Sequence, residues 1–164
     1  MAWTTPRTWV FGEFITAEIM NIHIKDNSLY LAGTMPFPLV DVPYSDADFL
    51  GPGGSADWVV DGVDVVTNTY AVDGKMMTWA VYINNSTIAN TPANLRLNIP
   101  GGYTANAGGY LLKGAYAPSG VWAVGQMWVV SGSQIAMSKL DLTTTFANET
   151  NTFHMGFIVS FGVV

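Results

Sequence analysis

Polar and apolar residues alternate along much of the chain after residue 56, the pattern expected of half-buried β-strands. The clearest stretch is residues 76–83, where every second residue is a large apolar one: Met77, Trp79, Val81 and Ile83. Asp73-Gly74, a pair that favours two-residue hairpin turns, stands before this stretch, and the β-branched and aromatic segment 63–72 precedes the turn. These residues predict a β-hairpin.

Further short segments with strand character follow, separated by Gly, Pro, Asn and Ser: Leu95–Ile99, Tyr110–Tyr116, Val121–Val130, Gln134–Leu142 and His154–Phe161. No alternation of strands with helices appears after residue 30, which argues against a parallel α/β sheet. We therefore predict a mainly β fold, an antiparallel, jelly-roll-like β-sandwich that follows an extended N-terminal arm and one short α-helix.

The N-terminal region, residues 1–32, has a different pattern. Its first 14 residues carry few helix signals, but Thr16 is a good N-cap, and Glu18 lies in the first turn that it would begin. We expect a helix from there to about Asp26, with Ile19 and Ile22 on one contact line. Two packings stay open: against the chain's own β domain, or around an axis with two other copies.

Proline and glycine dominate residues 33–55, with Pro36, Pro38 and Pro43 followed by the run Gly51-Pro52-Gly53-Gly54. This density disfavours both helices and central strands. We predict a linker here, a domain boundary near residue 55, and a β-sandwich knob over residues 56–164.

The composition bears on association. Apolar residues make up 49% of the chain and charged residues only 11%, a high ratio for a monomer in water. Part of the apolar surface is expected to lie between subunits. A monomer with an aromatic-rich core is the alternative.

The net charge is −6, and the six basic residues are scattered, so a nucleic-acid partner is not expected. Seven of the twelve acidic residues lie between Asp41 and Asp73. Within that run the spacing of Asp57, Asp61 and Asp64 suits calcium ligation, but a solvated acidic rim is the simpler account. We therefore predict no metal site and no cofactor.

The chain has no cysteine and no secretory signal after Met1, and its apolar runs are far shorter than the ~20 residues that cross a bilayer. We expect no membrane association. The two histidines, His23 and His154, stand in no catalytic spacing, so we do not expect an enzyme. Three tyrosines are candidates to face a ligand: Tyr103, Tyr110 and Tyr116. Alternation puts Trp122 and Trp128 on one face, where burial in the sandwich explains them equally well.

The arm also carries a sequence signature. Residues 3–27 follow the pattern W-T-T-P-R-T-W-x-x-G-E-x-x-T-A-x-x-x-N-x-H-x-x-D-N. This segment resembles the N-terminal signature of tailed-bacteriophage virion structural proteins, in which it precedes a variable β-rich module. The Asp73-Gly74 hairpin and the segment 94–100 also resemble, more loosely, a recurrent phage β-sandwich module.

The resemblance implies that the arm attaches the protein to the virion, after assembly in the host cytoplasm. The implied anchoring residues are Trp3, Pro6, Arg7, Trp9, Phe11, Gly12 and Glu13, and the implied helix contacts are Ile19, Ile22 and His23. The indoles would enter apolar grooves of the major capsid protein or another virion protein.

The resemblance thus implies a surface appendage, expected to be a homotrimer, that is either a capsid decoration or a head-fibre protein. The alternative is a tail-associated fibre, a receptor-binding protein or a carbohydrate-binding β module that contacts glycans of the host surface. Because the Pro/Gly-rich segment begins soon after the signature, a long fibre shaft is not expected.

Overall fold

The computed structural model describes residues 16–21, 39–106, 112–142 and 144–164. The chain divides into two units, Met1–Pro38 and Leu39–Val164, each of which is described by itself. No helix within these described ranges is long and apolar enough to cross a membrane.

In the first unit the structure describes one short helix, α1 (Ala17–Met20). Thr16 caps it as predicted, because the Ile19 backbone N–H donates to the Thr16 hydroxyl oxygen at 3.2 Å. The predicted extension of the helix to Asp26, the contacts of Ile22 and His23, and all seven predicted anchoring residues lie outside the described residues.

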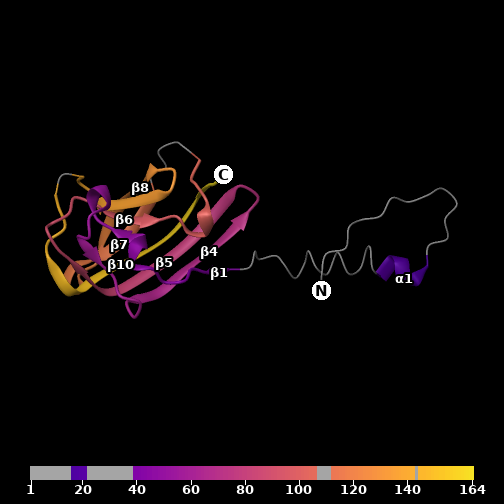
Figure 1. Cartoon of the computed structure of the whole chain (residues 1–164), viewed down its shortest axis with the longest axis horizontal. Helices are drawn as coiled ribbons and strands as arrows, with labels where there is room; N and C mark the ends of the chain where they lie inside the picture. Colours follow the sequence, from indigo (N-terminus) through magenta and orange to yellow (C-terminus); the bar gives the residue numbers. More distant parts are fainter. Residues whose placement is uncertain (1–15, 22–38, 107–111, 143) are drawn as a thin grey trace. The chain divides into compact units, whose positions relative to one another are not determined.

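The second unit is built from antiparallel strands (Figure 1). Seven strands are four residues or longer: β4 (Val65–Asp73), β5 (Met76–Ile88), β6 (Leu95–Asn98), β7 (Leu112–Ala117), β8 (Ala123–Ser131), β9 (Gln134–Lys139) and β10 (Glu149–Gly162). Three strands have two residues each: β1 (Val40–Asp41), β2 (Phe49–Leu50) and β3 (Trp58–Val59). Single 3₁₀ turns lie between them: η2 (Asp46–Asp48), η3 (Pro52–Gly54), η4 (Pro100–Gly102) and η5 (Pro118–Gly120).

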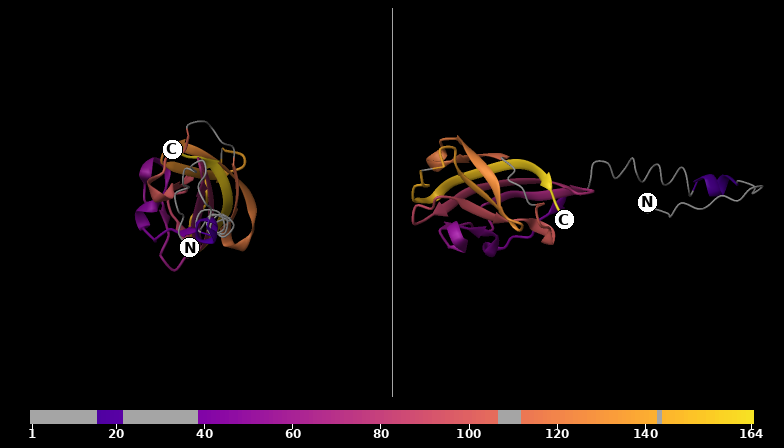
Figure 2. Two further views of the ribbon diagram at one scale, coloured as in Figure 1. Left: turned by 90° about the vertical axis from the view of Figure 1, so that its right-hand side faces the viewer. Right: turned by 90° about the horizontal axis from the view of Figure 1, so that it is seen from above.

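The strands form one sheet in the order β1-β4-β5-β10-β7-β8-β9-β6-β2, with β3 paired to β5. Because the neighbouring segments β2 and β3 pair with strands far apart in this order, the sheet must curl around a common interior (Figure 2). β10 follows this curvature, with register shifts against β5 between Glu149 and Met155. The predicted mainly β, sandwich-like fold is confirmed.

The predicted hairpin is present. β4 and β5 pair antiparallel, with Asp73 opposite Met76, so the two turn residues are Gly74 and Lys75 rather than the predicted Asp73 and Gly74. Gly74 has φ of +56°. A residue without a Cβ adopts this left-handed conformation without steric cost, which explains the glycine at this turn.

The inner face of the sheet forms the core. On β5 it carries the predicted alternating residues, and on β10 it carries Phe153, Met155, Phe157, Val159 and Phe161. Trp79 and Phe157 meet edge to face, with ring centroids 5.4 Å apart. Each fully buried side chain of this size stabilises the fold by about 1.5–3 kcal/mol.

The predicted linker over residues 33–55 is wrong from residue 39 onward. β1 pairs with β4 and β2 pairs with β6, so the boundary falls at Pro38/Leu39 rather than near residue 55. Both strands stand at the ends of the sheet order, where neighbouring prolines interrupt few ladder hydrogen bonds. Phe49 is buried, and this apolar contact holds the segment on the sheet.

Candidate functional site

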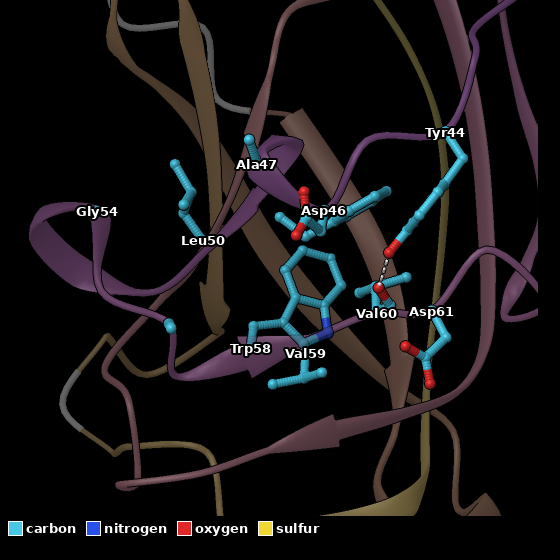
Figure 3. Close-up of a pocket in the computed structure, with 11 residues that line it drawn as sticks. Tyr44, Asp46, Ala47, Leu50, Gly54, Trp58, Val59, Val60 and Asp61 are labelled. Carbon is cyan, nitrogen blue, oxygen red and sulfur yellow. Dashed lines mark hydrogen bonds between the residues drawn. The ribbon is translucent and has the colours of Figure 1, made fainter.

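A cavity of about 390 Å³ lies within the segment that contains η2, β2, η3 and β3. Its lining residues come from positions 44–61, a stretch of short turns and two-residue strands (Figure 3). Ligand pockets commonly have volumes from about 300 to 1,000 Å³, so this cavity has room for a small ligand or one sugar unit.

Two buried aromatic rings form the base of the cavity. Phe49 and Trp58 meet edge to face, with centroids 5.3 Å apart. The Trp58 indole N–H donates to the Ser86 hydroxyl oxygen at 3.0 Å, and Ser86 in turn donates to the Phe153 carbonyl at 3.2 Å. These bonds satisfy the polar atoms beneath the cavity and fix the orientation of the indole.

Tyr44 forms a wall of the cavity and is 44% exposed. Its ring stacks near Phe49 at a centroid distance of 6.2 Å, and its hydroxyl donates to the Val60 carbonyl at 2.6 Å. A ring held at both its face and its hydroxyl is pre-organised, which lowers the entropy cost of contacting a ligand.

Carboxylates surround this wall. Asp46 and Asp61 both line the cavity and are exposed. Burial, and then the negative charges of Asp46, Asp61 and Asp64, raise the pKa of the Tyr44 hydroxyl. The cavity therefore offers one aromatic surface beside charged hydrogen-bond acceptors.

The loop between η3 and β3 is held by Asp57. Its carboxylate accepts hydrogen bonds from the hydroxyl of Ser55 and from the side-chain amide of Asn90, and these bonds lower the pKa of Asp57. A Cβ at Gly51 would lie 2.5 Å from the Ser55 hydroxyl oxygen, so the chain passes too closely here for a side chain.

Two of the three aspartates considered as calcium ligands, Asp57 and Asp64, accept hydrogen bonds within the protein. Asp57 is bonded as described above, and an Asp64 carboxylate oxygen accepts the Asp61 backbone N–H at 2.9 Å. Within the part of the chain that the structure describes, no three His, Cys, Asp or Glu side chains are grouped to hold a metal ion.

The tyrosines predicted to face a ligand are not brought together at this cavity. Tyr116 is 7% exposed, and its ring packs against Phe146 and Phe153. The prediction that Tyr116 faces a ligand is therefore wrong. Tyr103 is half-buried and meets Tyr70 edge to face at 6.1 Å. Tyr110 lies outside the described residues.

The sequence analysis missed Tyr44, because it read the surrounding segment as a linker. The signal present there was the run of acidic residues beside aromatic ones between positions 41 and 61. Acidic or aromatic residues in a sequence do not by themselves distinguish a pocket from a solvated loop. The fold places Tyr44, Asp46 and Asp61 around one cavity.

Three other residues that the sequence analysis considered do not line the cavity. Trp122 is 54% exposed rather than buried in the sandwich, whereas Trp128 is half-buried. His154 lies beside Trp122, with ring centroids 6.3 Å apart, and its Nδ1 accepts the Asn85 backbone N–H at 3.4 Å.

No protein-family model and no characterised protein matches the sequence. Among solved structures, the chain is similar to the head domain of phage bIL170, described in a study of the receptor-binding domains of lactococcal phages. The two are 16% identical, the match covers 76% of this chain and 100% of that domain, and the TM-score is 0.44. A likeness of this size establishes neither a shared fold nor a shared function.

Proposed function

We propose that this chain is a component of a bacteriophage virion whose β domain binds a carbohydrate of the host surface. Two independent features support the proposal. The N-terminal signature over residues 3–27 resembles that of virion structural proteins, and the β domain has a cavity with ligand-binding chemistry.

The observation that carries the binding function is the half-exposed Tyr44 ring between carboxylates, on the wall of a 390 Å³ cavity. A sugar ring has an apolar C–H face and a rim of hydroxyl groups. The C–H face packs on an aromatic ring, while the hydroxyls donate to carboxylates such as those of Asp46 and Asp61.

Capsid decoration is the other function that the resemblance implies. A decoration protein requires a surface complementary to the shell but no cavity for a small ligand. The cavity therefore favours the receptor-binding alternative, in which the arm attaches the protein to another virion protein and the β domain faces the host.

The binding function is tested with saccharide arrays that display bacterial surface polysaccharides and their oligosaccharide fragments. Full-length protein is expected to bind at least one glycan. Tyr44→Ala is expected to weaken that binding by about tenfold or more, because the stacking surface is lost, whereas Tyr44→Phe keeps the ring and should bind more tightly than Tyr44→Ala.

Leu140→Ala is a matched control, because Leu140 is exposed and apolar but does not line the cavity. An array on which the wild-type protein binds no saccharide would refute the binding function. So would a glycan that Tyr44→Ala binds as tightly as the wild type.

Attachment to the particle is tested separately with Trp9→Ala. If the arm anchors the protein, the variant is expected to be absent from purified virions, while its β domain keeps the circular dichroism of the wild type. Normal incorporation of Trp9→Ala would rule out this anchor and leave the carbohydrate-binding function standing.

A further inference from the structure

The cavity between positions 44 and 61 is lined by negative charge that no positive charge offsets. Its lining contains two carboxylates, those of Asp46 and Asp61, and both residues are exposed. The basic residues that the structure describes all lie outside the lining: Lys75, Arg96, Lys113 and Lys139. A ligand in this cavity therefore meets a negative potential.

The protein does not use these two carboxylates in its own bonding. Within the described residues, no hydrogen bond or ion pair reaches the side chain of Asp46 or Asp61, whereas Asp57 and Asp64 accept hydrogen bonds from their neighbours. Burial first, and then the charges of nearby aspartates that include Asp46 and Asp61, raise the pKa of the Tyr44 hydroxyl, so the negative charge reaches the aromatic wall.

The side-chain donors of the cavity, in contrast, are already occupied. Among the described lining residues, only Tyr44 and Trp58 carry an O–H or N–H group in the side chain. The Tyr44 hydroxyl donates to the Val60 carbonyl at 2.6 Å (Figure 3). The Trp58 indole N–H donates to the Ser86 hydroxyl oxygen at 3.0 Å. The side chains of the cavity therefore present acceptors to a ligand and no free donor.

This arrangement discriminates between classes of saccharide. Phosphate, sulfate and carboxylate groups are negative and accept hydrogen bonds, so they would be repelled and would find no side-chain donor. An acetamido carbonyl needs a donor as well. A protonated amine has three donors, no acceptor and a positive charge. Its hydrogen bonds to carboxylates are about twice as strong as neutral ones, and an aromatic face such as that of Tyr44 attracts it.

We infer that the cavity selects a saccharide unit that carries a protonated amine, which is an amino sugar without an N-acetyl group. This inference rests on the carbohydrate-binding function proposed above and names the class of sugar. The amine donates to Asp46 or Asp61, and the cavity volume of about 390 Å³ has room for one such unit.

The test is a matched series of oligosaccharides on the array, beside the bacterial polysaccharides: oligomers of glucosamine, of N-acetylglucosamine and of glucose, with the same linkage and length. The full-length protein is expected to bind the glucosamine oligomer about tenfold more tightly than the other two. Any other array ligand with a free amine is compared with its chemically N-acetylated form, which is expected to bind about tenfold more weakly.

Salt separates charge-dependent binding from binding that depends on shape alone. Because both carboxylates are exposed, raising the NaCl concentration from about 0.05 M to about 0.5 M is expected to weaken binding of the amine-bearing saccharide. Binding of the glucose oligomer is expected to stay the same.

Two variants locate the effect in the cavity. Asp46→Asn and Asp61→Asn each remove a charge but keep the size of the side chain and an acceptor oxygen. Each is expected to weaken binding of the amine-bearing saccharide about fivefold or more, and to change binding of the glucose oligomer by about twofold or less. Asp73→Asn is the matched control, because Asp73 is exposed and does not line the cavity. Circular dichroism checks that all three variants are folded.

The outcomes distinguish this inference from the function on which it rests. If the tightest ligand carries no free amine, and Tyr44→Ala still weakens its binding, the inference is overturned and carbohydrate binding stands. The inference is also overturned if Asp73→Asn weakens binding as much as Asp46→Asn, because the net charge of −6 would then attract the amine without the cavity. If no saccharide binds, both the inference and the carbohydrate-binding function are refuted.

Discussion

The two faces of β5 and β10 carry residues of similar apolar character but have different surroundings. On the inner face, Trp79 and Phe157 are buried against each other and the rest of the core. On the opposite, outward face of these strands, Ile158 is exposed and Tyr82 is half-buried, with the Trp122 ring 6.4 Å from its own. The comparison teaches that the apolar character of a strand residue does not by itself tell whether the fold buries it or leaves it exposed.

The cavity adds a third kind of surface to this comparison. It also exposes an aromatic ring, that of Tyr44, but it is concave and bordered by carboxylates, whereas the outward face of β5 and β10 is a sheet surface. A concave acidic site suits a small polyhydroxylated ligand, and the carbohydrate-binding proposal follows from that chemistry.

The largest effect that separates the faces is expected for truncation of large side chains on β10. Phe153→Ala, on the inner face, removes a fully buried ring that contacts Phe146 and Tyr116, and should lower the free energy of unfolding by about 3–5 kcal/mol. Ile158→Ala, on the outward face, should cost about 0.5 kcal/mol or less in the isolated chain. Urea unfolding at low protein concentration measures both.

This comparison has a plain contrary outcome. If Phe153→Ala and Ile158→Ala lower the free energy of unfolding equally, the two faces of β10 are not buried to different degrees as described.

A smaller effect is expected for a matched pair of serines. Ser86→Ala removes the acceptor of the Trp58 indole N–H at a buried site and should cost about 1–3 kcal/mol. Ser160→Ala removes an exposed hydrogen bond of 2.8 Å with Thr78 on the outward side and should cost about 0.5 kcal/mol or less. Thermal unfolding of the two variants provides the comparison.

The serine pair also connects the core to the cavity. Because Trp58 forms part of the cavity base, Ser86→Ala is expected to weaken saccharide binding, whereas Ser160→Ala should leave it unchanged. Similar losses of stability in the two variants would contradict the assignment of Ser86 to a buried network.

Much of the fold could be predicted from the sequence. The alternation in residues 76–83 and Gly74 each indicate a local structure, since a two-residue period and a turn glycine have few other interpretations. The turn itself begins at Gly74, one residue later than predicted, because Asp73 still pairs with Met76. Thr16 predicted the start of α1 for the same kind of reason, because the cap bond joins residues three positions apart.

The segment before β3 could not be predicted in this way. Its strands β1 and β2 have only two residues each, too short to show a period, and they exist because β4 and β6 offer edges to pair with. The cavity depends on this docking, so Tyr44 carried no recognisable signal until the chain placed it beside Phe49 and the carboxylates.

The exposure of aromatic side chains was also decided by tertiary contacts. Tyr116 and Trp122 are six residues apart on the same hairpin, yet the first is buried against Phe146 and Phe153 and the second is exposed beside Tyr82. The sequence by itself determined the longer strands, the hairpins and the virion-like signature, because these depend on neighbouring residues. Only the tertiary structure decided which rings are buried, which line a cavity and which face of the sheet is left uncovered, because those depend on residues far apart in the chain.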